Sequence, residues 1–326
     1  MGSDVSQFFH AVGVFFDHLA AVHFGALGIA VALHVLKIVA RTVAWRNILR
    51  AAFPGARVKH RVVFGAYVSG VGLNSIAPAR TGDALKLYLA KRGIEGSNYA
   101  TLASTLFVET LFDICVASAL FIWALQLGVL PSLDVLPRIP DVDWAWAARN
   151  PRLAILIGTV LFFLAVVGAF WAAGRITEFR HRLASGFAIL GNRRRYLTEV
   201  VSWQALSWAF RFASVWWFLK AFGIPATLHN AALILVVQSL STLLPISPGG
   251  AGTQQGLTAY VLRGKAGSTT ALLSFSVGMN IATIVTNVLI GSLALVLTLR
   301  TLRWRRHMRA NEPVPVITSV ERQRRG

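Results

Sequence analysis

NSIAPARTGDALKLYL, residues 74–89, places three charges, a proline and a glycine inside a strongly apolar chain. The charges are Arg80, Asp83 and Lys86, all within seven residues. A charged side chain at the bilayer centre costs about 2.5–3.5 kcal/mol on insertion scales, so it normally faces a partner or water. The stretch therefore predicts an interruption in a membrane helix.

The surrounding chain has the composition of a helical membrane protein. It has 326 residues, of which 55% are hydrophobic and only 14% charged, with a mean hydropathy of +0.60. Soluble domains contain roughly 25% charged residues. Several uncharged runs exceed the roughly 20 residues that cross a bilayer, namely 153–174, 221–262 and 266–299. We predict an all-α integral membrane protein that forms a polytopic helical bundle.

The formal net charge of +19 lies mostly in loops beside apolar runs, as expected for membrane topology and contact with anionic lipids. No nucleic-acid recognition module is present, so nucleic acid is excluded as a partner. The single cysteine, Cys115, excludes internal disulfides and thiolate metal sites. Catalytic and dinucleotide-binding motifs are absent, so we predict no catalytic residue, metal or cofactor and no enzyme activity.

Apolar periodicity and helix breakers predict seven segments, at about 24–48, 62–92, 97–130, 152–174, 198–222, 228–265 and 268–300. Arginine-rich loops at 46–61 and 175–195 and the tail from residue 300 are expected in the cytoplasm, whereas the acidic loop 131–151 is expected outside. Seven full crossings do not fit these sides. They fit if both 62–92 and 228–265 are re-entrant hairpins. The first would enter from the cytoplasm and return there, and the second would enter from outside and return there, which leaves Arg263 and Lys265 external.

Three regions follow from this topology. Residues 1–23 are predicted to be an amphipathic segment and 24–300 the transmembrane domain, followed by a cytoplasmic arginine-rich tail at 301–326. We expect a multi-pass protein of the cell membrane with a cytoplasmic C-terminus.

An internal repeat favours the two hairpins. APARTGDA (77–84) and SPGGAGTQ (247–254) share the pattern small–Pro–x–x–x–Gly–polar. Two hairpins of opposite entry at corresponding places are typical of transporters built from inverted repeats. The alternative is that proline and glycine only kink ordinary membrane helices.

Three motifs resemble the lysylphosphatidylglycerol synthase transmembrane family, also called flippase-like. They are PARTGDALK (78–86), VETLFD (108–113) and LPISPGGAGTQQG (244–256), and the resemblance covers roughly 24–300. Several positions depart from the family pattern, with Asp83 for glutamate, Lys86 for arginine, Ala79 for glycine, Thr110 for arginine and Gln255 for glutamate.

The resemblance implies an integral-membrane fold that binds lipid-linked substrates. In multiple peptide resistance factors, a domain of this kind is thought to flip aminoacylated phosphatidylglycerol that a soluble domain makes. Only a short tail follows residue 300, so we expect no synthase domain and no synthesis of that lipid here.

The candidate substrate site combines the charged motif, two carboxylates, one arginine and the second motif. Its residues are Asn74, Pro78, Arg80, Gly82, Asp83, Lys86, Glu109, Asp113, Arg211, Pro248, Gly249, Gly250, Gly252, Gln254 and Gln255. Membrane lipids are the expected partners, and the ligand is an anionic headgroup or lipid-linked phosphate.

Structural roles compete with binding at several of these positions. Arg80 and Asp83 could pair with each other and hold the hairpin closed, leaving Lys86 to meet the anion. Glu109 and Asp113 are four residues apart on one helix face, so one is expected to be protonated or paired with Arg80, Lys86 or Arg211.

Such carboxylates could carry protons or belong to a fixed network of ion pairs between helices. His34, Lys37 and Arg41 share a stripe that could line a headgroup entrance, although snorkelling is favoured for Arg41. Gln254, Gln255, Asn280 and Asn287 could bind a headgroup or join neighbouring helices.

The predicted function is a flippase or transporter of a phospholipid or polyprenyl-phosphate substrate, working by alternating access. One alternative is a membrane accessory protein of lipid or glycan synthesis that transports nothing. A membrane glycosyltransferase with Asp83, Glu109 or Asp113 as catalytic carboxylate is another. The oligomeric state and energy source stay open.

Overall fold

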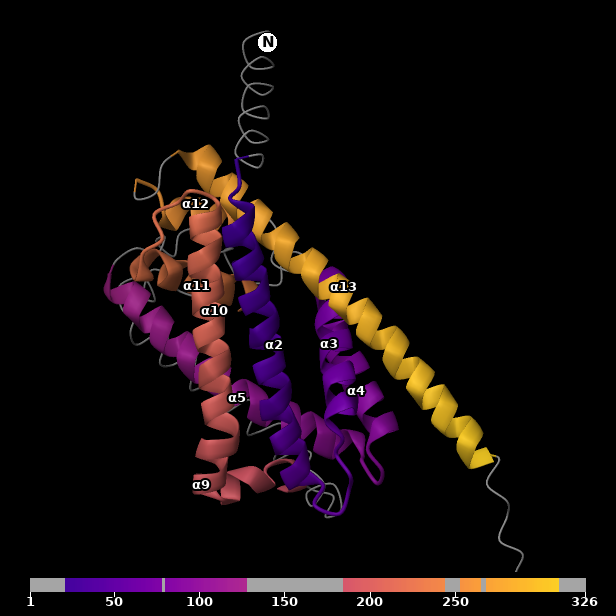
Figure 1. Ribbon diagram of the computed structural model, residues 1–326. Coiled ribbons are helices and arrows are strands. Elements are labelled where there is room, and N and C mark those ends of the chain that lie inside the picture. The colour runs from indigo at the N-terminus through magenta and orange to yellow at the C-terminus, as the bar shows by residue number, and fades with distance from the viewer. Residues whose placement is uncertain (1–20, 78–79, 128–183, 244–252, 265–267, 311–326) are drawn as a thin grey trace, which may run out of the picture.

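The computed structural model describes residues 21–77, 80–127, 184–243, 253–264 and 268–310, and every regular element in these ranges is a helix. The main helices are α2 (Phe24–Ala52), α3 (His60–Ile76), α4 (Thr81–Gly93), α5 (Tyr99–Gln126), α10 (Ser202–Ala221), α11 (Leu228–Leu243), α12 (Thr253–Val261) and α13 (Thr269–Ala310) (Figure 1). Three of them, α2, α5 and α13, are long and apolar enough to cross a membrane. The predicted all-α membrane class is confirmed.

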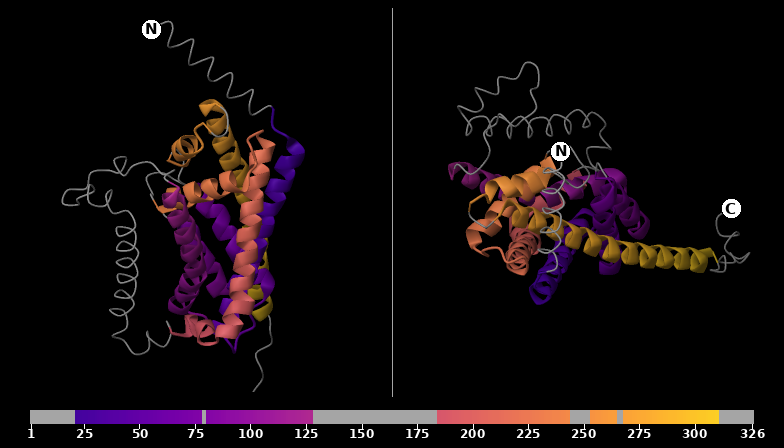
Figure 2. Two further views of the ribbon diagram at one scale, coloured as in Figure 1. Left: turned by 90° about the vertical axis from the view of Figure 1, so that its left-hand side faces the viewer. Right: turned by 90° about the horizontal axis from the view of Figure 1, so that it is seen from above.

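Two antiparallel helices, α2 and α10, form the centre of the bundle and lie side by side along most of their length (Figure 1, Figure 2). Serine hydroxyls join them directly. Ser207 Oγ donates to the Lys37 carbonyl at 3.1 Å, and Ser214 Oγ donates to the Ala30 carbonyl at 2.8 Å. Small polar residues of this kind let membrane helices approach closely and satisfy their own hydrogen bonds.

Three short helical elements precede α10 in the chain. They are η2 (Ala188–Gly191), α9 (Arg193–Tyr196) and η3 (Leu197–Val201). Asn192 caps α9 by accepting from the Arg195 amide at 3.0 Å. Asn47 Nδ2 ties this region to α2 through the Glu199 carbonyl at 2.8 Å.

The predicted segment 62–92 is two helices, α3 and α4, that pack side by side with a break between them (Figure 1). Arg80 precedes α4 in the left-handed conformation, with φ 55° and ψ 34°. Asn74 completes the start of α4 from the neighbouring helix. Its Oδ1 accepts from the Gly82 amide at 2.7 Å and its Nδ2 donates to Asp83 Oδ1 at 3.1 Å.

Gly70 and Gly82 allow α3 and α4 to approach this closely. A Cβ added at Gly70 would lie 2.7 Å from the Gly82 carbonyl oxygen. The chain thus reverses at the predicted break, and a return of the hairpin to one face of a membrane stays a prediction.

The second predicted hairpin, 228–265, also divides into two helices. Its first helix, α11, has 16 residues, and its second, α12, has nine. Both are shorter than the roughly 20 residues of a full span. The connection at 244–252, the acidic loop 131–151, the segment 152–174 and residues 1–20 lie outside the described residues.

Helix α13 is the longest element and extends ten residues beyond its predicted end at residue 300, to Ala310. It crosses α3 where Gly72 and Gly291 meet, since a Cβ on Gly72 would lie 2.8 Å from Gly291 Cα. Seen from above, it projects well away from the bundle (Figure 2). Large apolar side chains are exposed along its length, Ile281, Val285, Leu289, Leu293 and Leu297 among them.

Candidate functional site

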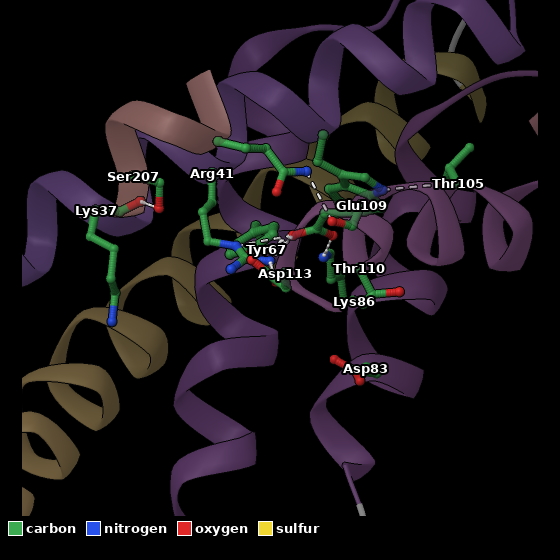
Figure 3. Close-up of polar contacts among 12 residues, drawn as sticks. Lys37, Arg41, Tyr67, Asp83, Lys86, Thr105, Glu109, Thr110, Asp113 and Ser207 are labelled. Carbon is green, nitrogen blue, oxygen red and sulfur yellow. Dashed lines mark hydrogen bonds and ion pairs between the residues drawn. The ribbon is translucent and has the colours of Figure 1, made fainter. Parts of the chain in front are cut away.

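Five side chains from α2, α3, α4 and α5 form a charge cluster, which we define as Arg41, Tyr67, Lys86, Glu109 and Asp113 (Figure 3). Glu109 is 3% exposed and lies at its centre. Its Oε2 accepts from Lys86 Nζ at 2.7 Å. Its Oε1 accepts from the Tyr67 hydroxyl at 2.7 Å and from Arg41 Nη2 at 3.2 Å. The Glu109 carboxylate is therefore fully satisfied.

Arg41 bridges the two carboxylates of α5, because its Nη2 also pairs with Asp113 Oδ2. Trp208 Nε1 donates to the other Asp113 oxygen at 2.8 Å. Lys86 also lies over the rings of Tyr67 and Trp45, 3.8 Å and 4.2 Å from their centroids. These contacts explain how a membrane-length helix accommodates Glu109 and Asp113 one turn apart.

Sequence reasoning identified part of this arrangement. Pairing of Lys86 with a carboxylate of α5 was one of the predicted alternatives and is confirmed. Snorkelling of Arg41 is wrong, because its side chain is 19% exposed and pairs inward with Glu109 and Asp113. The sequence shows that α2 carries a cation at this position, but the carboxylates facing it depend on how α5 packs.

The three charges of the opening motif do not form one site. Arg80 is exposed, and its predicted pairing with Asp83 is wrong, because Asp83 accepts from Asn74 instead. Figure 3 shows Asp83 apart from the cluster, while Lys86 reaches into it. The sequence suggested that Lys86 is left to bind an anion. In the structure Lys86 is instead paired with Glu109.

Beside the charge cluster lies a partly open cavity of about 300 Å³ between α2, α3, α10, α11, α12 and α13. Its charged lining consists of Lys37, Arg41 and Arg211. Its uncharged polar lining includes His34, Gln238, Gln254, Asn280, Thr283 and Asn287. Side chains far apart in the sequence thus converge on one polar hollow, which we call the cationic cavity.

Two cations of the cationic cavity lack a carboxylate within salt-bridge distance in the described part of the chain. Arg211 Nη2 donates to Gln238 Oε1 at 3.1 Å, and its guanidinium lies 4.7 Å from the Trp208 ring centroid. Lys37 extends away from the charge cluster (Figure 3) and donates to His34 Nδ1 at 3.2 Å. Asp113 acts on both cations only at longer range.

His34 continues the Lys37 contact into a chain of hydrogen bonds. A lysine only donates, so His34 Nδ1 accepts, and Nε2 carries the proton given to Asn287 Oδ1 at 2.9 Å. Asn287 Nδ2 then donates to Ser75 Oγ at 3.0 Å. Asn287 therefore joins α13 to α2 and α3, which confirms the inter-helix role considered for it.

The remaining predicted site residues fall in different places. Arg211 and Gln254 both line the cationic cavity, and Gln254 is 8% exposed. Gln255 is half-buried on α12, and Gly82 belongs to the contact between α3 and α4. Pro78, Pro248, Gly249, Gly250 and Gly252 lie outside the described residues.

Gln238 and Tyr67 were not predicted from the sequence. Both belong to the apolar parts of the two predicted hairpins, and only the neighbours they meet give them a polar role. No group of three or more metal-ligating side chains gathers within the described ranges.

Comparison with known proteins gives one match. The family described as "Lysylphosphatidylglycerol synthase TM region" matches residues 8–291. No curated protein and no solved structure matches the chain.

Proposed function

Since the chain belongs to the lysylphosphatidylglycerol synthase TM region family, we propose that it is a flippase or transporter of an anionic or lipid-linked substrate. The family fits a membrane protein of lipid metabolism or transport. The proposal adds movement of the substrate between leaflets by alternating access, and a location in the cell membrane with a cytoplasmic C-terminus.

The observation that carries the proposal is the cationic cavity. Lys37 and Arg211 are placed among membrane helices without a carboxylate in contact within the described residues. Ionisable side chains at such positions are expensive and are typical of substrate pathways. A concave site with a few convergent polar groups is also the usual form of a small-ligand site.

The arrangement of helices supports movement as well as binding. The cavity is lined by α3, which belongs to the first broken segment, and by α11 and α12, which form the second. In transporters built from repeats, substrate sites lie between broken helices, and one repeat rocks against the other.

A glycosyltransferase role is less well supported. Glu109 is bound by Lys86, Arg41 and Tyr67, and Asp113 by Arg41 and Trp208. A general acid or base has to reach the proton it transfers, and these oxygens already have partners. The transmembrane region of this family is a non-catalytic domain, and we assign no enzyme activity to the chain.

The test is leaflet redistribution in vesicles that contain the purified protein. Fluorescent anionic, aminoacylated and polyprenyl-phosphate lipids are each tested with three proteins, which are wild type, Arg211→Gln and the exposed control Lys220→Gln. Movement of one lipid class that only Arg211→Gln abolishes is the expected result. No movement of any class by folded protein would contradict a flippase and favour a non-transporting accessory protein.

A further inference from the structure

The charges around the cationic cavity do not balance. Arg41 and Lys86 are paired with Glu109 and Asp113, so the charge cluster is neutral as a unit. Lys37 and Arg211 remain, which leaves a surplus of two positive charges. At the start of α4, Arg80 and Asp83 add one charge of each sign and do not change this surplus.

Both surplus cations keep unused donors. A lysine ammonium has three protons, and Lys37 gives one to His34. A guanidinium has five N–H groups, and among the described residues Arg211 has one hydrogen bond, to Gln238. Multiple donors carrying positive charge are what phosphate oxygens bind most strongly.

Neutral polar groups lie beside them on α12 and α13. The side-chain amides of Gln254 and Asn280 line the same cavity and have no hydrogen-bond partner within the described residues. An amide can both donate and accept, so these two groups suit hydroxyls attached next to a phosphate.

We propose that Lys37 and Arg211 together bind a phosphate group with two negative charges, such as a phosphomonoester or a diphosphate. Gln254 and Asn280 contact the hydroxyl-bearing or ester-linked atoms beside it. An aminoacylated lipid is rejected because its ammonium groups offset the charge of its own phosphate and leave the two cations of the cavity uncompensated. The inference rests on the proposed function and names the charge class of its substrate.

Equilibrium binding to the purified full chain in nanodiscs tests the charge class. The probes are short-chain phosphatidic acid, farnesyl diphosphate, short-chain phosphatidylglycerol, lysylphosphatidylglycerol and inorganic phosphate. We expect the first two to bind about tenfold or more tightly than phosphatidylglycerol, and the lysylated lipid not to bind. Loss of a charge-assisted contact in Lys37→Gln or Arg211→Gln should weaken binding about 10- to 100-fold.

Lys220→Gln is the matched control, because Lys220 is exposed on the same helix as Arg211 and its ammonium lies over the rings of Trp216 and Trp217. The affinity of Lys220→Gln for phosphatidic acid and for farnesyl diphosphate should equal that of wild type. Phosphatidic acid should also raise the unfolding temperature of wild type and of Lys220→Gln, but not that of the two cavity variants. A cooperative unfolding transition in the cavity variants without lipid shows that they fold.

Equal binding of inorganic phosphate would support the same site and assign it to free phosphate. Tight binding of lysylphosphatidylglycerol, or unchanged affinity in both cavity variants, would overturn the inference. Binding with this preference but without leaflet movement would refute only the flippase. Movement of aminoacylated lipid would refute only the charge class.

Discussion

At the scale of single residues, Arg80 is the unusual position. It is the one residue other than glycine with a positive φ in the described chain. A side chain in the left-handed region costs about 1–2 kcal/mol, because Cβ crowds the following carbonyl. Arg80 thus occupies a strained position at the first break, although its exposed side chain makes no ion pair there with Asp83.

Replacing Arg80 separates backbone strain from charge. Arg80→Gly should stabilise the protein relative to Arg80→Ala by about 1 kcal/mol, because glycine adopts the left-handed conformation without that cost. Thermal unfolding in one detergent measures the difference. An alanine variant as stable as the glycine variant would show that the backbone at this break is not strained.

The Lys86–Glu109 pair gives a second prediction at this scale. Glu109→Gln should destabilise the protein by about 3 kcal/mol or more, because it leaves buried Lys86 without a carboxylate. Lys86→Met should cost less, because Glu109 keeps its ion pair with Arg41. The double variant should cost clearly less than the sum. Chemical denaturation of all four proteins measures the coupling, and additive losses would show that the pair does not interact.

Single residues also show where sequence reasoning reaches its limit. The stripe of His34, Lys37 and Arg41 was visible from helical spacing, and Arg211 and Gln254 were selected as polar residues in apolar segments. Their convergence was not visible, because it depends on how α10, α12 and α13 are rotated against α2. The same uncertainty made Arg41 look like a snorkelling residue.

At the scale of elements, the breaks were the more predictable features. Proline and glycine predicted an interruption within 62–92, and in the structure that segment forms two helices, α3 and α4. The contact of Asn74 with the start of α4 was not predictable, because it joins residues across the hairpin. The C-terminal end of α13 was underestimated because arginines suggested a tail, although arginine is a good helix former.

The crossing of α3 and α13 is sensitive to one methyl group. A Cβ at Gly72 would lie 2.8 Å from both the Asn287 carbonyl and Gly291 Cα, so Gly72→Ala should cost about 1–3 kcal/mol. Gly28→Ala is the control, since nothing lies within 4 Å of a Cβ there. Thermal unfolding measures the stability of both variants. An equal change in stability for Gly72→Ala and Gly28→Ala would mean that α3 and α13 can move apart without cost.

At the scale of the whole molecule, the topology in the membrane is the main prediction still to be tested. Helix class and number of apolar segments follow from hydropathy, but the side on which each hairpin ends does not. Gly93 lies against Val62, so the two ends of the α3–α4 segment are adjacent. A re-entrant hairpin requires both ends on the same side of the membrane, which the positive charge of the loop at 46–61 predicts to be the cytoplasm.

Single cysteines can test this topology in a Cys115→Ser background, which removes the exposed native thiol. Arg57→Cys and Arg92→Cys, at exposed positions flanking the segment, should both react with an impermeant maleimide only from the cytoplasmic side. Arg263→Cys should react only from outside. Labelling of Arg57→Cys and Arg92→Cys from opposite sides would make the first segment a full crossing.

The length of α13 has a mechanical consequence. At 1.5 Å per residue, a continuous helix of 42 residues is about 63 Å long, roughly twice the thickness of the hydrocarbon core. The bundle holds α13 as far as Thr298, which lies against Gly65, and the last twelve residues of the helix, 299–310, extend beyond that contact. At 1.5 Å per residue that end is about 18 Å long, so a change of about 10° in its tilt would displace its tip by about 3 Å.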